Sequence, residues 1–329
     1  MASPRPSLYA RLVLLLIAFF AYQTSLFADD AQAEALLKQG SVDDASAMLN
    51  QVLAVQPHES RAHQLLCRVF YAQDMADAAI RECEQAIQDD ASSSNSQSES
   101  EMWLGRAYGL KASHENMLSA FASARKLHAA FERAVQLNPS NVQAMSDLCQ
   151  FYVAAPAIVG GGVDKARALV PQVMPRSAAK AHRILALIAQ KKNDVATAET
   201  EYRSAIASGK APEPWVDLGQ FYQEHSQPEK AVAALQSSVQ ANRTRNAALV
   251  DVASILNDLH QEPDLAEKVL RDYLASAAKS DDAPAFKVHL QLGDLLKRRG
   301  DPEGAQREYA AALAMASNYA PARKAAQGA

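Results

Sequence analysis

Apolar residues recur along most of the chain at the three- and four-residue spacing of an amphipathic helix. Leu148, Phe151 and Tyr152 show this spacing, and the alternation typical of a strand does not persist over any useful length. Pro57 and Pro139 stand where a proline would stop one helix before the next begins. Together with the alanine-rich segments, the pattern predicts an all-α protein.

Two stretches share one hairpin pattern, with a small residue on each of two successive helices. They read Trp215-x2-Leu218-Gly219-x2-Tyr222 followed by Ala231-x3-Leu235, and Leu292-Gly293-x2-Leu296 followed by Ala305-x3-Tyr309. Small residues are needed there because two antiparallel helices must approach closely. The pattern resembles the tetratricopeptide repeat (TPR). The resemblance implies a right-handed superhelical solenoid that holds other molecules.

The small position of the second helix can be followed through the chain at intervals of 34, 48, 39, 32, 33, 35 and 39 residues. Most intervals are close to the 34-residue repeat length. We place the surplus of the longest interval in 92–100 and around 112–121, and that of the first 39-residue interval in 154–162. Insertions at turns leave stacked helices intact. The positions are Ala45, Ala79, Leu127, Ala166, Ala198, Ala231, Ala266 and Ala305.

This register predicts about eight stacked helical hairpins. We assign the first hairpins to 29–91 and the main array to 102–317, with a short cap or frayed end at 318–329. The serine-rich segment 92–101 between them has no apolar residue that could stabilise an ordered structure, so we expect it to be a flexible linker.

The first 28 residues have the layout of an export signal. Arg5 and Arg11 precede an uninterrupted run of ten apolar residues, 12–21, which is too short to span a bilayer comfortably. Cleavage after Ala28 would give a periplasmic or secreted bacterial protein with no stable membrane insertion. The alternative is that the segment is retained as a short anchor.

The net charge narrows the classes of partner, and the cysteine content narrows the possible disulfides. Removing 1–28 would change the net charge from -4 to -6, which disfavours nucleic acid and anionic lipid as partners. The three cysteines are too few for a disulfide scaffold. Cys67, Cys83 and Cys149 stand at positions that face the helix interface, where we expect small buried residues; a bond between Cys67 and Cys83 remains an alternative.

No catalytic, cofactor or metal pattern stands out in the sequence. The histidines lie in separate units, and His63, His182 and His289 occupy nearly the place of Trp215, where packing accounts for them. The glycines of 160–162 lack the Gly-Lys-Ser/Thr of a phosphate loop, so we interpret them as a turn. The surrounding segment also resembles one found in exported bacterial TPR proteins. We therefore expect neither enzyme activity nor a bound cofactor.

The resemblance places the partner-binding groove on the first helix of each hairpin. Polar residues predominate there, and the asparagine and lysine of the family's carboxylate clamp are replaced. Arg68 and Arg106, with no nearby acid expected, could receive a carboxylate or phosphate between them. The predicted groove residues are Arg68, Tyr71, Arg106, Gln150, Arg183, Gln190, Gln220 and Gln223.

These observations predict a non-catalytic scaffold of the cell envelope that binds a protein or peptide. Two alternatives stay open: a membrane-tethered assembly factor that retains its first segment, and an accessory subunit of an envelope enzyme. An enzyme-associated groove should show clustered carboxylates or aromatic residues, and Tyr71 is the single aromatic residue among those predicted.

Overall fold

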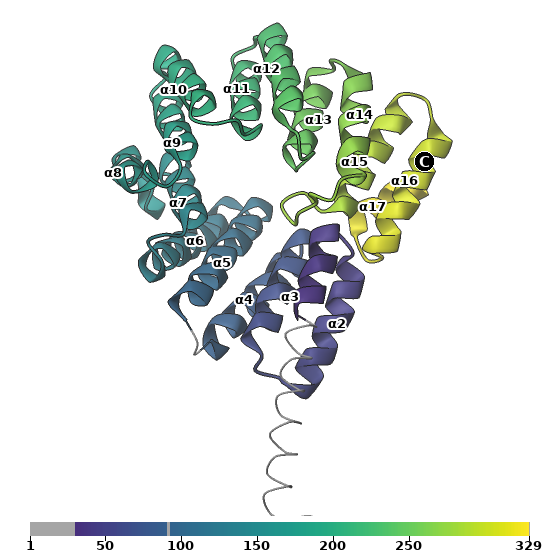
Figure 1. The fold of residues 1–329 in the computed structure, drawn as a ribbon. Coiled ribbons are helices and arrows are strands. Elements are labelled where there is room, and N and C mark those ends of the chain that lie inside the picture. Colours follow the sequence, from purple (N-terminus) through teal and green to yellow (C-terminus); the bar gives the residue numbers. More distant parts are fainter. Residues whose placement is uncertain (1–29, 91–92, 329) are drawn as a thin grey trace, which may run out of the picture.

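The computed structural model describes residues 30–90 and 93–328, which form helices paired into eight successive hairpins (Figure 1). The described part of the first helix, α1, covers 30–39. The first hairpins contain α2 (Val42–Val55), α3 (Ser60–Ala72), α4 (Ala76–Asp89), α5 (Ser94–His114), α6 (Met117–Leu137), α7 (Val142–Ala154) and α8 (Val163–Val173). The others contain α9 (Ala178–Lys191), α10 (Val195–Ala207), α11 (Glu213–Glu224), α12 (Pro228–Ala241), α13 (Ala248–Leu259), α14 (Pro263–Leu274), α15 (Ala285–Arg298) and α16 (Pro302–Met315). A last helix, α17 (Ala320–Gln327), follows them.

The predicted all-α stack of eight hairpins is therefore confirmed. Close helix approach occurs where the sequence places its small residues. A Cβ atom on Gly219 of α11 would lie 2.8 Å from a methyl group of Leu235 on α12. A Cβ atom on Gly293 of α15 would lie 2.5 Å from the ring of Tyr309 on α16. Glycine at these positions lets the two helices of a hairpin pack closely against each other.

The serine-rich segment is not a linker, and this part of the domain prediction is wrong from residue 94 onwards. Ser93 caps α5 by accepting a hydrogen bond from the backbone N–H of Ser96. Ser98 and Ser100 are fully buried, and the Ser98 hydroxyl donates to the carbonyl of Ala134 on α6 at 2.8 Å. Serine is small enough for a helix interface, and its hydroxyl can bond to a backbone carbonyl there, so apolar residues are not required.

The other insertions lie at the ends of helices. Both α5 and α6 have 21 residues, so the surplus around 112–121 lengthens this hairpin at its tip. The surplus at 154–162 forms a short 3₁₀ helix, Ala157–Val159, and the expected glycine turn. Gly160 has φ +102°, and a Cβ atom there would lie 2.4 Å from the His128 ring, so both backbone and space favour glycine.

The eight hairpins curve until the two ends of the array meet, which closes the stack into a ring (Figure 1). One hydrophobic cluster contains Leu37 and Leu65 from the first helices together with Phe286, Ala316 and Ala322 from the last. All five are 0% exposed. The repeat pattern predicts stacking between neighbouring hairpins, but it does not predict this contact between the ends.

Polar contacts accompany the cluster at the closure. Asp74, in the turn after α3, accepts a 2.7 Å bond from Lys287 on α15 and a 3.0 Å bond from Tyr319. The Asp43 carboxylate accepts from the backbone N–H of Ser317. Tyr319 directly precedes α17, and Ala322 of that helix lies in the cluster with the first hairpins. Residues 318–328 are therefore an ordered part of the closure, and the frayed-end alternative is wrong.

Cys67 on α3 and Cys83 on α4 form a disulfide, with both side chains fully buried. The expectation that both cysteines are unbonded buried residues is therefore wrong for this pair. A hairpin that brings small residues into contact also brings two cysteines within bonding distance. Cys149 remains a free buried thiol, as expected.

The predicted export signal, 1–28, lies outside the described residues. Among those described, no helix is both long and apolar enough to cross a membrane.

Candidate functional site on the inner face of the ring

The first helices of the hairpins lie toward the centre of the ring, and the second helices lie outside them. Figure 1 shows α7, α9, α11, α13 and α15 around the central opening, with α8, α10, α12, α14 and α16 on the outer side. The inner helices are the ones that the resemblance assigns to the groove. Residues on these helices therefore lie on the inner side of the array.

A row of paired charges connects neighbouring inner helices. Arg106 on α5 donates through Nε to Asp147 on α7 at 2.8 Å. Arg183 on α9 donates in the same way to Asp217 on α11, also at 2.8 Å. Both aspartates stand two residues before the small residue of their helix, so they occupy equivalent repeat positions. These charge-assisted bonds hold the arginine side chains in place on the inner face.

Trp103 interrupts the row, because it stands at the equivalent position on α5, two residues before Gly105. Arg68, on the preceding inner helix α3, therefore has no aspartate at this position of α5 to bind. Its Nε donates instead to Asp281 at 2.8 Å, and its Nη1 lies 3.4 Å from Glu34 on α1. Burial favours the neutral form, but Asp281 and Glu34 outweigh it and raise the pKa of Arg68.

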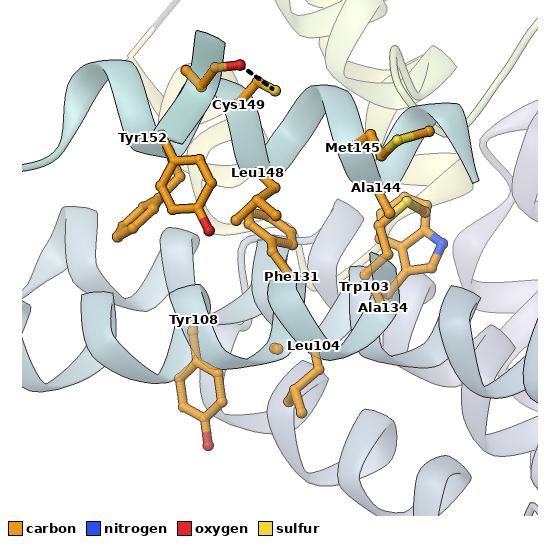
Figure 2. Close-up of a cluster of buried hydrophobic side chains, with 14 of the residues drawn as sticks. Trp103, Leu104, Tyr108, Phe131, Ala134, Ala144, Met145, Leu148, Cys149 and Tyr152 are labelled. Atoms are coloured by element: carbon orange, nitrogen blue, oxygen red, sulfur yellow. Dashed lines mark hydrogen bonds between the residues drawn. The ribbon is translucent and has the colours of Figure 1, made fainter. Parts of the chain in front are cut away.

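Trp103 organises the arginines around its ring. The guanidinium carbons of Arg68 and Arg106 lie 5.4 Å and 4.6 Å from the ring centroid, within the range of cation–π contacts. Tyr71 packs edge-on against the same ring at 5.4 Å. Behind this surface Trp103 lies beside Ala144 in the hydrophobic cluster of α5, α6 and α7 (Figure 2). The cluster holds the indole, and hence both arginines, in place. We call Arg68, Tyr71, Trp103 and Arg106 the arginine cluster.

The carboxylates that meet the arginine cluster come from the connection between α14 and α15, residues 275–284. This loop extends from the last hairpins toward α3 and α5 (Figure 1). Asp281 is only 10% exposed and binds Arg68. Asp282 is 71% exposed and has an oxygen 3.8 Å from Nη1 of Arg106. The premise that no acid lies near the two arginines is therefore wrong: the chain itself supplies carboxylates to both.

Asp251 on α13 continues the row of equivalent aspartates but has no basic partner among the described residues. It stands two residues before Ala253, as Asp217 stands before Gly219. The preceding inner helix, α11, presents Gln220 where α5 presents Arg106. Burial in the wall of the ring, together with repulsion from Asp217, raises the pKa of Asp251 to about 6, although its side chain reaches solvent.

The remaining predicted residues, apart from Gln223, line two neighbouring pockets of the inner face. Arg183, Gln190 and Gln220 line one pocket between α7, α9, α10 and α11, with Tyr202 and Phe221 in its wall. Gln150 and Arg183 line the other.

The structure thus brings the predicted groove residues together in two groups on one surface. Gln223 lies three residues beyond Gln220 on α11 but lines neither pocket. Gln190 donates to Glu224 on α11 at 2.9 Å, and Gln220 donates to the same carboxylate at 3.1 Å. Whether these residues bind a partner stays a prediction.

Sequence reasoning missed Trp103, Asp251, Asp281 and Asp282. A signal for the loop was present, since the last interval between small positions is 39 residues and its surplus was not located. A second signal that was overlooked is the replacement of the repeated aspartate by Trp103 on α5.

The histidines at the Trp215 position have a shared structural role. His63, His182 and His289 each place Nδ1 2.7 Å from a glutamate on the second helix of the same hairpin. Within the described ranges, no group of three or more histidine, cysteine or acidic side chains is arranged to hold a metal ion.

Residues 33–98 match the tetratricopeptide repeat family, and the fold around them is the TPR stack of helical hairpins. The chain therefore contains tetratricopeptide repeats within a TPR-like fold. The matched region contains α3 and the start of α5, so it includes Arg68 of the arginine cluster. TPR proteins bind protein or peptide partners, which makes the inner face the candidate interaction surface of this TPR protein.

Solved TPR structures resemble the chain at low sequence identity. Yeast Tom70 aligns with a TM-score of 0.50 at 12% identity, over 87% of this chain and 58% of its own. A thermophilic TPR protein of Thermus thermophilus aligns at 16% identity with a TM-score of 0.44, over 69% of this chain and 99% of its own. The likeness to Tom70 shows the fold alone.

A curated relative is the BBSome complex member BBS4 homolog of Drosophila melanogaster, 21% identical over 192 residues. The match covers 54% of this chain but only 37% of the Drosophila protein. The chain therefore spans little more than a third of the length of this relative.

Proposed function

We propose that this TPR protein is a non-catalytic scaffold that binds a protein or peptide segment on the inner face of its ring. The observation that carries the proposal is the convergence of the polar pockets and the arginine cluster on that one face. Paired charges hold these side chains in position before a partner arrives, which lowers the entropy lost on binding.

We further propose that the protein works in the bacterial cell envelope after export. Two observations support this location: the apolar run 12–21 has the layout of an export signal, and the Cys67–Cys83 disulfide suits an oxidising compartment. Mass spectrometry of the protein from a bacterial periplasmic fraction should find a chain shortened by about 28 residues. An intact first segment on membrane-bound protein would favour the tethered assembly factor instead.

Site-specific photo-crosslinking tests the inner-face proposal. A photoreactive residue at Gln220 lies on the inner helix α11, and one at Gln236 lies exposed on the outer helix α12. We expect one discrete cross-linked partner from position 220 and none from position 236. Cross-linking of the same partner at position 236 alone, or equally at both, would contradict binding on the inner face.

A further inference from the structure

The loop 275–284 contacts the arginine cluster through two adjacent acids, and Tyr273 of α14 orients the turn that carries them. The Tyr273 hydroxyl donates to the carbonyl of Ala283 at 2.7 Å and accepts from the backbone N–H of Ser280 at 3.1 Å, which are the residues on either side of the two acids. At the tip, Asp281 binds Arg68, and Asp282 lies near Arg106. Serine, alanine, lysine and aspartate dominate its sequence, so the tip brings little apolar surface to this contact.

Other contacts than these acids also join the ends of the array. The cluster around Phe286 and Ala322, together with the bonds of Asp74 to Lys287 and Tyr319, joins the ends of the array separately. Asp281 supplies the carboxylate that Trp103 takes from Arg68 on the inner helices, and Asp282 adds a second carboxylate beside Arg106, which already binds Asp147.

We propose that residues 276–284 are an internal ligand that occupies the arginine cluster and competes with an acidic segment of a partner protein. This inference rests on the proposed function and names the chemistry of the partner: a peptide segment with two adjacent aspartates or glutamates. Such a segment binds the same guanidinium groups as Asp281 and Asp282, because a carboxylate accepts charge-assisted hydrogen bonds from arginine in the same geometry.

The internal ligand binds in preference to a free peptide because it is covalently attached to the rest of the chain. A segment attached by a short connection has an effective concentration in the millimolar range, so a free peptide of equal intrinsic affinity competes poorly. The intact chain should therefore bind simple acidic peptides weakly. Release of the loop, by mutation or by a partner with additional contacts elsewhere on the inner face, should expose the arginines.

The test uses the full chain and a fluorescein-labelled peptide with the sequence of residues 276–284, followed by fluorescence anisotropy at low salt. The variant carries Asp281→Asn and Asp282→Asn, and the matched control carries Asp44→Asn and Asp258→Asn, two exposed aspartates on α2 and α13. We expect the variant to bind the peptide at least tenfold more tightly than the parent and the control. Adding Arg68→Gln and Arg106→Gln to the variant should remove this gain.

A second measurement on the unmodified chain covers the case in which the variant does not fold. Excess labelled peptide should accelerate hydrogen exchange in residues 276–284 while leaving α11 unchanged. Equal peptide affinity for parent and folded variant, or unchanged exchange in the loop at saturating peptide, would overturn the proposal. The Gln220 cross-linking result is independent of both readouts, so failure of the internal ligand can be told from failure of the inner-face function.

Discussion

The Tyr319 hydroxyl donates a 3.0 Å hydrogen bond to Asp74, although 245 positions separate the two residues. The same aspartate carboxylate also accepts from Lys287. In a linear repeat array each hairpin contacts mainly its neighbours, so local damage has local effects. A closed ring couples its first and last hairpins directly.

This coupling predicts a long-range effect of Phe286→Ala. The Phe286 ring is fully buried between the two ends and contacts Tyr319, with 4.9 Å between the ring centroids. We expect its removal to lower the free energy of unfolding by about 3–5 kcal/mol, because it leaves a cavity at the closure. Hydrogen exchange in α2, far away in sequence, should become faster. The control Phe221→Ala, in the middle of the array, should destabilise comparably but leave α2 protected; equal exchange in both would contradict closure.

Gly219→Leu tests the hairpin register. A Cβ atom at this position would already lie 2.8 Å from Leu235, so a larger side chain must push α11 and α12 apart. We expect a loss of about 1–3 kcal/mol in chemical denaturation. Gly209→Leu is the matched control, since no atom lies within 4 Å of the place that a Cβ atom would take there and its φ is not restricted to glycine. A Gly219→Leu protein as stable as the parent would show that the assigned contact is absent.

Thiol counting tests the disulfide. The native chain should have no rapidly reactive thiol, because Cys67 and Cys83 are bonded and burial raises the pKa of Cys149 to about 12. Denaturation without reductant should reveal one thiol, and reduction should reveal three. Reduction should also cost about 3 kcal/mol of stability, since the bond closes a short loop. Three thiols in denatured, unreduced protein isolated from an oxidising compartment would contradict the bond.

We predict that Asp251→Asn stabilises the protein by an amount that depends on pH. The folded-state pKa of about 6 exceeds the ordinary value of 3.8, so the folded protein binds this proton more tightly than the unfolded chain. The stability contribution of Asp251 is therefore greatest at low pH and falls as the pH rises from about 4 to about 6. We expect the variant to melt above the parent near pH 7.5 and to lose that advantage near pH 3.5. Asp258→Asn, on the same helix, is the control; an equal gain from both variants would rule out a specific effect.

The repeated unit follows from the sequence alone. The spacing of Gly219, Ala231 and their equivalents fixes helix type and hairpin register, because each depends on residues close together in the chain. The same spacing places polar residues such as Arg106 and Gln220 on the first helices. The cysteine pair was left open, since a disulfide depends on a distance that spacing alone does not give.

The contents of the inner face, in contrast, depend on the tertiary structure. Small rotations between successive hairpins add up along the array, and their sum determines whether its ends meet; no local pattern encodes that sum. Closure brings α15 and α17 to the first hairpins and carries Asp281 to Arg68, a contact across 213 residues. The chemistry of the arginine cluster therefore depends on two segments that the repeat pattern treats as unrelated.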